Sequence, residues 1–185
     1  MKFLPGLLLF CTLGLAFGAE PLPTSLPGLK NFHRVSATLY RGAQPTTAGF
    51  AQLEAMGIKT VIDLRAFHSD ATFVRDGKIV VERFHFKTWH AEDEDIVRFL
   101  KIVTDTNRAP FFVHCQHGSD RTGTMVAVYR MAVEGWSSDR ALAEMTGPDF
   151  GFHPQWKNLV HHVKSLDVPA LRTRAGLAAP SAILP

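Results

Sequence analysis

The sequence predicts a single α/β domain, with a mostly parallel central sheet flanked by helices. Two observations indicate this fold class. Short apolar runs of strand length alternate along the chain with segments whose apolar residues recur at helical spacing. The chain has 185 residues, of which 46% are hydrophobic and 20% charged. This length suffices for one hydrophobic core and is too short to argue for two domains.

The first 19 residues have the layout of a secretory signal peptide. A basic start at Lys2 precedes an apolar run and the small residues Gly18 and Ala19, and cleavage is expected after either of these two. An uncleaved anchor is the alternative, but the apolar run is short for spanning a bilayer. We therefore expect an exported protein, periplasmic or secreted, with no membrane span in its mature form.

The first half of the mature chain is expected to contain three strands and one helix. The proline-containing segment 20–36 is predicted to be a leader without regular structure. A short strand lies within 38–45, and 47–56 has apolar residues at helical spacing and stops at a glycine. Two further strands are expected over 59–65 and 78–86, on either side of a polar loop.

The second half is expected to contain one strand and several helices. A helix over 91–106 precedes strand 110–114, whose β-branched and aromatic residues place it at the centre of the sheet. Further helices are predicted over 121–134, 138–145, 155–166 and, weakly, 169–175. The domain is expected to span 37–167, with a C-terminal tail over 168–185.

The segment VHCQHGSDRTG, which follows the central strand, combines a nucleophile with an anion-binding turn. Cys115 is the only cysteine left once Cys11 is removed with the signal peptide, so it cannot form an internal disulfide. A strand-to-helix turn points backbone N–H groups and the positive end of the helix dipole at one spot, which stabilises a thiolate. Gly118 lets the backbone curl, and Arg121 offers a planar fork for two phosphate oxygens. This arrangement suits phosphoryl transfer to sulfur.

The same segment resembles the signature of the cysteine-dependent protein tyrosine and dual-specificity phosphatases. Cys115 and Arg121 are separated by five residues, with His114 before the cysteine and Thr122-Gly123 after the arginine. The likeness extends in weaker form over about 37–165, including LYRGAQP and TVIDLR, and the small exported bacterial dual-specificity phosphatases are the most similar. The resemblance implies a metal-independent phosphatase that forms a cysteinyl-phosphate intermediate and needs no cofactor.

The resemblance also implies roles for individual residues. Cys115 would be the nucleophile, Thr122 would steady the leaving thiolate, and His114 would tune its acidity from behind. The phosphate would be bound by the Arg121 side chain and by the backbone of Gln116, His117, Gly118, Ser119, Asp120 and Arg121.

The general acid is expected within this loop. In the common pattern an aspartate follows the strand before helix 91–106, but FKTWHAEDED has none at that place, which falls near Trp89 or His90. Asp120 lies directly before the loop arginine, as in myotubularin-type lipid phosphatases and certain secreted bacterial phosphatases. Repulsion from a bound phosphate dianion would help its carboxyl keep a proton.

Asp93 is the second candidate for the acid. It lies with Glu92 and Asp95 in an expected first helical turn, where acidic residues already have a role in favouring the helix dipole. Asp120 has its own alternative, in which it turns outward and only orients the loop.

Other interpretations of the loop stay open. His114, Cys115 and His117 are possible zinc ligands, although Arg121 would repel a cation. A rhodanese-like sulfur carrier also has a cysteine in a strand-to-helix loop, and an inactive phosphate-binding module would keep the cradle without turnover.

Phosphotyrosine or phosphoserine proteins are the preferred substrates, and phosphoinositides or inositol polyphosphates are the alternative. A basic rim is expected from Arg41, Arg65, His68, Arg75, His90 and His117. The net charge of +3 fits attraction to anions in general and is too weak to argue for nucleic acid.

Overall fold

The computed structural model describes residues 26–74 and 77–178. The predicted signal peptide over 1–19, together with Cys11 and Arg75, lies outside the described residues. In the part of the chain that is described, no helix is long and apolar enough to cross a membrane.

The described residues form a five-stranded sheet in the order β1-β2-β5-β3-β4. The strands are β1 His33–Arg34, β2 Leu39–Gly42, β3 Thr60–Asp63, β4 Val80–Arg83 and β5 Phe111–His114. β1 pairs antiparallel with β2, and every other pair is parallel. The prediction of a mostly parallel sheet with the strand near 110–114 at its centre is confirmed.

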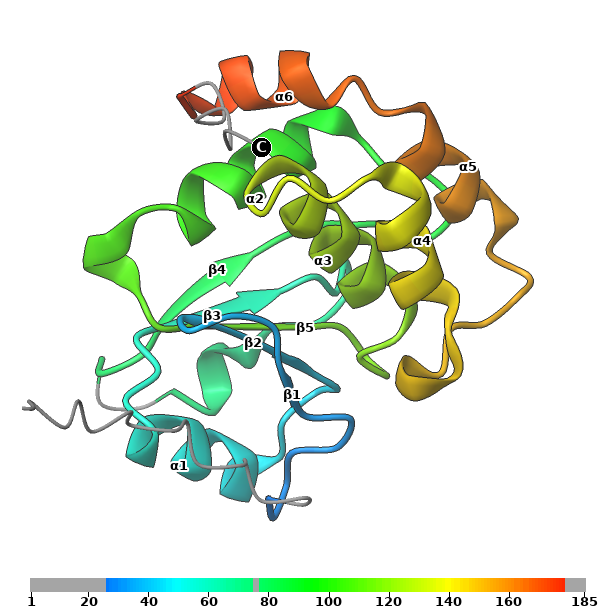
Figure 1. Ribbon diagram of the computed structural model, residues 1–185. Coiled ribbons are helices and arrows are strands. Elements are labelled where there is room, and N and C mark those ends of the chain that lie inside the picture. Colours follow the sequence, from blue (N-terminus) through cyan, green and yellow to red (C-terminus); the bar gives the residue numbers. More distant parts are fainter. Residues whose placement is uncertain (1–25, 75–76, 179–185) are drawn as a thin grey trace, which may run out of the picture.

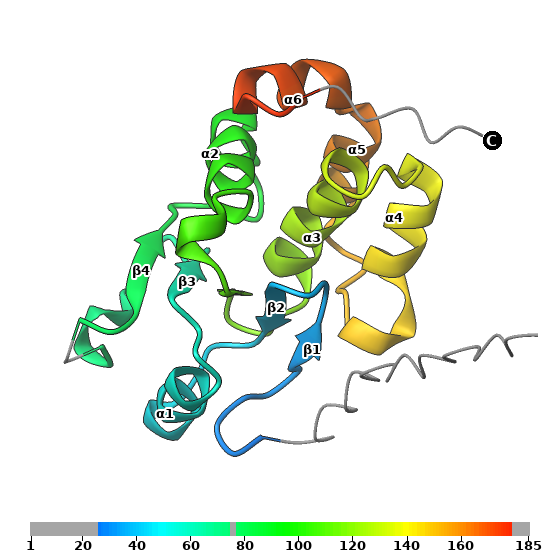
Figure 2. The same ribbon diagram turned by 60° about the vertical axis from the view of Figure 1, so that its left-hand side comes forward.

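Helices cover both faces of this sheet, as Figures 1 and 2 show. One face carries α1, Thr47–Ala55. The other face carries α2 Asp93–Val103, α3 Asp120–Ala132, α4 Ser138–Thr146, α5 Lys157–Ser165 and α6 Val168–Ala175. Three short 3-10 turns connect these elements, at Asp70–Thr72, Thr106–Arg108 and Pro148–Phe150.

The alternation of side chains along β5 explains why the sheet needs both layers. Phe112 points to the α1 side, where it packs with Phe50 and Leu53. Phe111 and Val113 point to the opposite side and join the larger core under α2 and α3. All are almost fully buried, and burial of each such side chain contributes about 1.5–3 kcal/mol.

Local signals in the sequence set the helix ends close to their predicted positions. Thr46 caps α1, because its side chain accepts a hydrogen bond from the Gly49 N–H, and the helix stops at Gly57, where φ is +75°. α3 begins at Asp120, one residue before the predicted start. All the expected helices are present with slightly different ends, namely those over 47–56, 91–106, 121–134, 138–145, 155–166 and 169–175.

The expected domain limits of 37 and 167 are too narrow. Residues 26–36 are not an irregular leader, because they contain β1 and bury Leu29 and Val35. At the other end, α6 packs against α2 and buries Leu171. Both segments were misjudged because their apolar residues are few and isolated, so their contribution to the core depends on partners distant in the sequence.

Candidate active site

Three strands end side by side at one edge of the sheet. Gly42 of β2 and Asp63 of β3 both lie level with His114, the last residue of β5. The carboxyl ends of adjacent parallel strands form the usual ligand crevice of such folds. The register therefore brings together LYRGAQP, TVIDLR and the loop that begins at Cys115.

The loop from Cys115 to Arg121 (the phosphate loop) connects β5 to the first turn of α3. The Cys115 side chain is an unpaired thiol and is buried, with 2% of its surface exposed. Gly118 has φ +74°, and a Cβ there would lie 2.5 Å from the carbonyl carbon of Gly42. Only glycine tolerates both the positive φ and the close approach of Gly42. The prediction that Gly118 lets the backbone curl is therefore confirmed.

A pocket of about 200 Å³ opens beside the phosphate loop. Arg121 and Gln116 line it from the loop, and Arg65 and Lys87 add positive charge from two other segments. Two aromatic side chains lie at the same pocket and are largely exposed, Phe67 at 84% and Trp89 at 62%. The pocket can therefore hold an anion at Arg121 with an apolar group beside it.

A wider hollow of about 710 Å³ lies on the other side of Gln116. Its lining includes His117 of the phosphate loop and two basic residues of the N-terminal segment, Lys30 and His33. Gln116 lines both spaces, so the two hollows adjoin at the loop.

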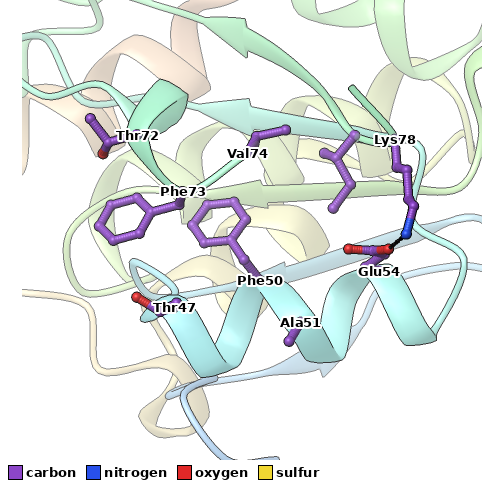
Figure 3. Close-up of a pocket in the computed structure, with 9 residues that line it drawn as sticks. Thr47, Phe50, Ala51, Glu54, Thr72, Phe73, Val74 and Lys78 are labelled. Carbon is purple, nitrogen blue, oxygen red and sulfur yellow. Dashed lines mark hydrogen bonds and ion pairs between the residues drawn. The ribbon is translucent and has the colours of Figure 1, made fainter. Parts of the chain in front are cut away.

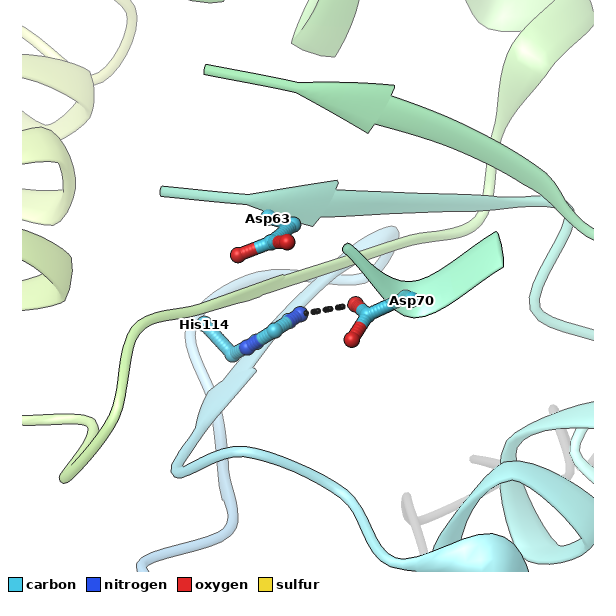
Figure 4. Close-up of side chains that lie close together, drawn as sticks. All are labelled: Asp63, Asp70 and His114. Carbon is cyan, nitrogen blue, oxygen red and sulfur yellow. Dashed lines mark hydrogen bonds and ion pairs between the residues drawn. The ribbon is translucent and has the colours of Figure 1, made fainter. Parts of the chain in front are cut away.

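His114 lies behind the phosphate loop in a buried polar cluster with Asp70 and Asp63 (Figure 4). Its Nε2 is 2.7 Å from Asp70 Oδ2, and its Nδ1 is 3.2 Å from the carbonyl oxygen of Cys115. Both neighbours can accept a hydrogen bond, and which ring nitrogens donate depends on the protonation state of the ring. The ring lies directly behind the cysteine.

The two carboxyl groups of this cluster differ in acidity. Burial alone would raise the pKa of Asp70, but the hydrogen bond and charge of His114 and a hydrogen bond from Gln44 outweigh it and lower the pKa. Burial raises the pKa of Asp63, and the charge of His114 and the N–H of Arg65 offset this effect only in part. Asp70 is therefore the anion that pairs with His114.

Asp63, Asp70 and His114 are also the one group among the described residues whose ligand atoms lie close enough together for a metal ion. Their atoms are already engaged with one another and with Gln44 and the Arg65 N–H, except for Asp63 Oδ2. The alternative zinc set of His114, Cys115 and His117 does not gather in this way in the described chain, because His114 points to Asp70.

Asp120 is held by His153, which follows the 3-10 turn Pro148–Phe150. The His153 backbone N–H donates to Asp120 Oδ1 at 2.9 Å, and its ring Nδ1 lies 2.9 Å from Oδ2. A hydrogen bond between His153 Nδ1 and Asp120 Oδ2 requires one proton, carried by either the ring or the carboxyl group. Asp120 is 7% exposed, so it forms a nearly buried proton-holding pair one residue before Arg121.

Asp93 lies elsewhere. Its carboxylate is 3.8 Å from His162 Nε2 and 3.8 Å from Arg174 Nη1, so it faces α5 and α6. Neither it nor its neighbours Glu92 and Asp95 line the pocket at Arg121. The structure thus keeps the second acid candidate away from the phosphate loop.

The other predicted site residues lie on or beside the loop with different exposure. Gln116 and His117 are exposed, whereas Ser119 is buried and precedes the first residue of α3. Thr122 is fully buried, and its Oγ1 has no hydrogen-bond partner in the described chain.

The predicted basic rim is only partly correct. Arg65 lines the pocket and His117 the adjoining hollow, but His68 faces Asp63 and Asp70, and His90 faces Glu92. Arg41 does not belong to a rim at all, because it is 1% exposed and lies beneath the phosphate loop. A strand arginine that points to the protein interior cannot be recognised from local sequence.

A further cavity of about 520 Å³ lies between α1 and residues 72–74 and 78–79 (Figure 3). Phe50 and Phe73 stack there with ring centroids 5.4 Å apart, and Glu54 pairs with Lys78. It contains no residue of the phosphate loop, so it is separate from the candidate active site.

Sequence reasoning missed several residues that complete the site. Those that contact it are Asn31, Gln44, Asp70, Lys87 and His153. They come from separated segments, and only Gln44, inside LYRGAQP, and Lys87, inside FKTWHAEDED, lay in stretches that had been singled out.

The comparisons with known proteins agree on one family. Residues 28–158 match the family described as DSP-PTPase phosphatase fused to NAD+ kinase. The chain is 34% identical over 146 residues to the dual specificity protein phosphatase TpbA of Pseudomonas aeruginosa. That match covers 77% of this chain and 65% of the relative, so the chain spans less than two thirds of that protein's length.

Solved structures of the same relative resemble this fold. The crystal structure of Pseudomonas aeruginosa TpbA superposes with a TM-score of 0.72 and 30% identity, covering 81% of this chain and 92% of that one. A structure of a TpbA variant in complex with pTyr gives a TM-score of 0.71 and 29% identity, covering 80% and 91%.

Proposed function

Since the chain belongs to the dual-specificity phosphatase family, we propose that it hydrolyses phosphate monoesters with Cys115 as nucleophile. The phosphate loop supplies backbone N–H groups, the N-terminus of α3 and the Arg121 fork to the phosphate. The His114 ring contacts the Cys115 carbonyl oxygen from behind and, when protonated, favours the thiolate of Cys115.

The reaction proceeds in two displacements. The thiolate attacks phosphorus, the ester P–O bond breaks, and the leaving oxygen takes the proton held between Asp120 and His153. Water then attacks the cysteinyl phosphate and gives a proton back to the same pair. The P–S bond breaks, inorganic phosphate leaves and the thiolate is regenerated.

We propose a phosphotyrosine side chain on a protein as the substrate. The observation that carries this proposal is the pair of exposed aromatic residues, Phe67 and Trp89, at the pocket that holds Arg121. A phenyl ring can lie against them while its phosphate reaches the loop, since aromatic rings interact favourably at centroid distances of about 4.5–7 Å. The pTyr complex of the Pseudomonas aeruginosa relative supports this choice.

The first test measures turnover of an aryl phosphate in the presence of a chelator. The wild-type protein is expected to hydrolyse it, and Cys115→Ser is expected to lose turnover while still binding phosphate. Activity that survives Cys115→Ser but is lost with chelator would refute the thiol mechanism. A persulfide on Cys115 after thiosulfate treatment, without phosphatase activity, would indicate a sulfur carrier instead.

The substrate class is tested with a phosphotyrosine peptide, a phosphoserine peptide and an inositol polyphosphate. Trp89→Ala is expected to raise KM for the phosphotyrosine peptide about tenfold, since loss of an aromatic contact costs about 0.5–1.5 kcal/mol. Val133→Ala, at another exposed apolar residue outside the pocket, is the control. Higher kcat/KM for the inositol polyphosphate, unaffected by Trp89→Ala, would contradict the proposed substrate.

A further inference from the structure

Three carbonyl groups of the phosphate loop accept hydrogen bonds from residues 31–44, outside the loop. The Gln116 carbonyl accepts from the Gln44 backbone N–H at 3.3 Å, and the His117 carbonyl accepts from Asn31 Nδ2 at 3.0 Å. The Gly118 carbonyl accepts from Arg41 Nη2 at 2.8 Å. Three consecutive peptide groups therefore each have one partner from residues 31–44.

These bonds set the direction of the loop N–H groups. In a planar trans peptide, the carbonyl and the next residue's N–H point in opposite directions. Anchoring the carbonyls of 116–118 outward therefore turns the N–H groups of His117, Gly118 and Ser119 to the other side. In the described part of the chain these three N–H groups donate to no protein acceptor, which leaves them available to an oxyanion.

The backbone conformation and the side-chain hydrogen bonds of Asn31 both fit a role in holding the loop carbonyls. It is the one described residue other than glycine with a positive φ, +50°, a conformation that asparagine tolerates better than most residues. Its amide nitrogen donates to the carbonyls of His117 and Phe150, and its amide oxygen contacts His33 Nε2 at 3.1 Å. Asn31 thus joins the phosphate loop to the turn that precedes His153.

Arg41 holds the next peptide from below. Its guanidinium lies 4.0 Å from the centroid of the Phe150 ring, and its Nε and Nη1 have no hydrogen-bond partner in the described chain. Burial lowers the pKa of Arg41 to about 10, although Glu144 and Cys115 oppose this, so the side chain remains a cation at neutral pH. Burying a charged group costs free energy, and here the hydrogen bond to the Gly118 carbonyl and the contact with the Phe150 ring offset part of that cost.

We propose that Asn31 and Arg41 are positioning residues that orient the N–H groups of the phosphate loop toward the substrate phosphate. This inference rests on the proposed function, since it takes the loop as the phosphate site. Neither residue touches the phosphate; each acts through a loop carbonyl. Arg41 also places a positive charge behind the bound dianion.

The test measures the Kd for inorganic phosphate by calorimetry, in a full-length Cys115→Ser background, well below the Tm of each variant. Asn31→Gly removes the side chain and keeps the left-handed backbone available, and Arg41→Met removes the donor and the charge. Each is expected to weaken phosphate binding about tenfold, since one hydrogen bond is lost from a loop that must then be reordered on binding. Arg41→Lys, which retains a charge and a donor, is expected to restore most of the affinity.

Arg34→Met is the matched control, because Arg34 is an exposed arginine of the same segment whose Nε donates to the Ser36 carbonyl. Variants with lowered Tm but the phosphate Kd of the control would show a merely structural role and would overturn the inference. If Arg41→Met does not fold, the phosphate Kd of Asn31→Gly alone tests the inference. Failure of the wild-type protein to turn over substrate, with these differences in Kd intact, would overturn the proposed function alone.

Discussion

Asp120 and His153 form the pair on which proton transfer depends in the proposed mechanism. The sequence pointed to Asp120 because the usual acid position, near Trp89 or His90, contains no aspartate. The structure adds His153, whose backbone N–H and ring both bind the carboxyl group. His153 therefore places a second titratable group against the Asp120 carboxyl group, beside Arg121.

Replacing Asp120 with asparagine should slow substrates according to their leaving group. With a phenol leaving group, kcat is expected to fall by about 10²–10⁴, the usual contribution of a general acid. With an activated nitrophenol the loss should be much smaller, because that leaving group departs without a proton. The measurement is a comparison of kcat for phenyl phosphate and p-nitrophenyl phosphate.

Asp93→Asn is the control, since Asp93 faces α5 and α6. A leaving-group-dependent loss in Asp93→Asn, with equal slowing of both substrates in Asp120→Asn, would assign the acid to the other loop. Asp120 would then only shape the phosphate loop.

Asp63 and Asp70 should respond in opposite ways to substitution by asparagine. The pKa of Asp70 is lowered below its ordinary value of 3.8, despite burial, mainly by its hydrogen bond with His114. The folded protein therefore binds fewer protons at this group than the unfolded chain, and its stabilisation is present above pH 3.8 and lost as pH falls through the folded pKa. Asp70→Asn should lower the free energy of unfolding at pH 7 by about 1–3 kcal/mol.

Burial raises the pKa of Asp63 above 3.8, so its contribution to stability depends on pH in the opposite direction. The contribution of Asp63 to wild-type stability falls as pH rises from 3.8 through the folded pKa, because the folded state loses its excess proton. Asp63→Asn should therefore be as stable as the wild type near pH 3.5 and relatively more stable as pH rises. Urea unfolding of both variants between pH 3.5 and 7 tests the pair; parallel pH profiles would contradict the assignment.

The phosphate loop, as an element, depends on how closely it approaches β2. Gly118 and Gly135 have nearly the same φ, +74° and +72°, but a Cβ at Gly118 would lie 2.5 Å from the Gly42 carbonyl carbon, whereas a Cβ at Gly135 would meet nothing within 4 Å. Comparing substitutions at the two glycines therefore separates the cost of a left-handed backbone from the cost of a steric clash with β2.

Gly135→Ala should cost only the strain of a left-handed residue, about 1 kcal/mol, with kcat/KM unchanged. Gly118→Ala should cost more, about 2–4 kcal/mol once displacement of the loop is added, and should abolish measurable turnover. Urea unfolding and aryl phosphate kinetics measure both effects. Equal destabilisation of the two variants would show that the loop can move away from β2 without penalty.

At the scale of the whole molecule, the N-terminal segment 26–36 is part of the folded domain. It contributes β1, buries Leu29 at 4% exposure and stacks Phe32 on Tyr40 and Phe112. A chain that lacks residues 1–36 should therefore have a Tm lower by about 10 °C or more than one that lacks residues 1–25, since loss of such contacts costs about 2–5 kcal/mol. Differential scanning calorimetry makes the comparison, and equal Tm values would restore the narrower domain boundary.

The sequence by itself determined the fold class, the order of most helices and strands, and the position of the phosphate loop. These features follow from local patterns: apolar periodicity, capping residues such as Thr46, and the spacing of Cys115 and Arg121. Such signals are carried by residues that are close in the chain, and they can be read without knowing the fold.

Only the tertiary structure decided which distant residues complete the site. Asn31, Arg41, Asp70 and His153 reach the loop across sequence separations of 33 to 86 residues. They meet it because the register of parallel strands aligns Gly42, Asp63 and His114 at one edge. No local pattern encodes that alignment: it is set by the packing of the whole sheet between its two helical layers, and it turns Arg41 from an expected surface cation into a buried support of the loop.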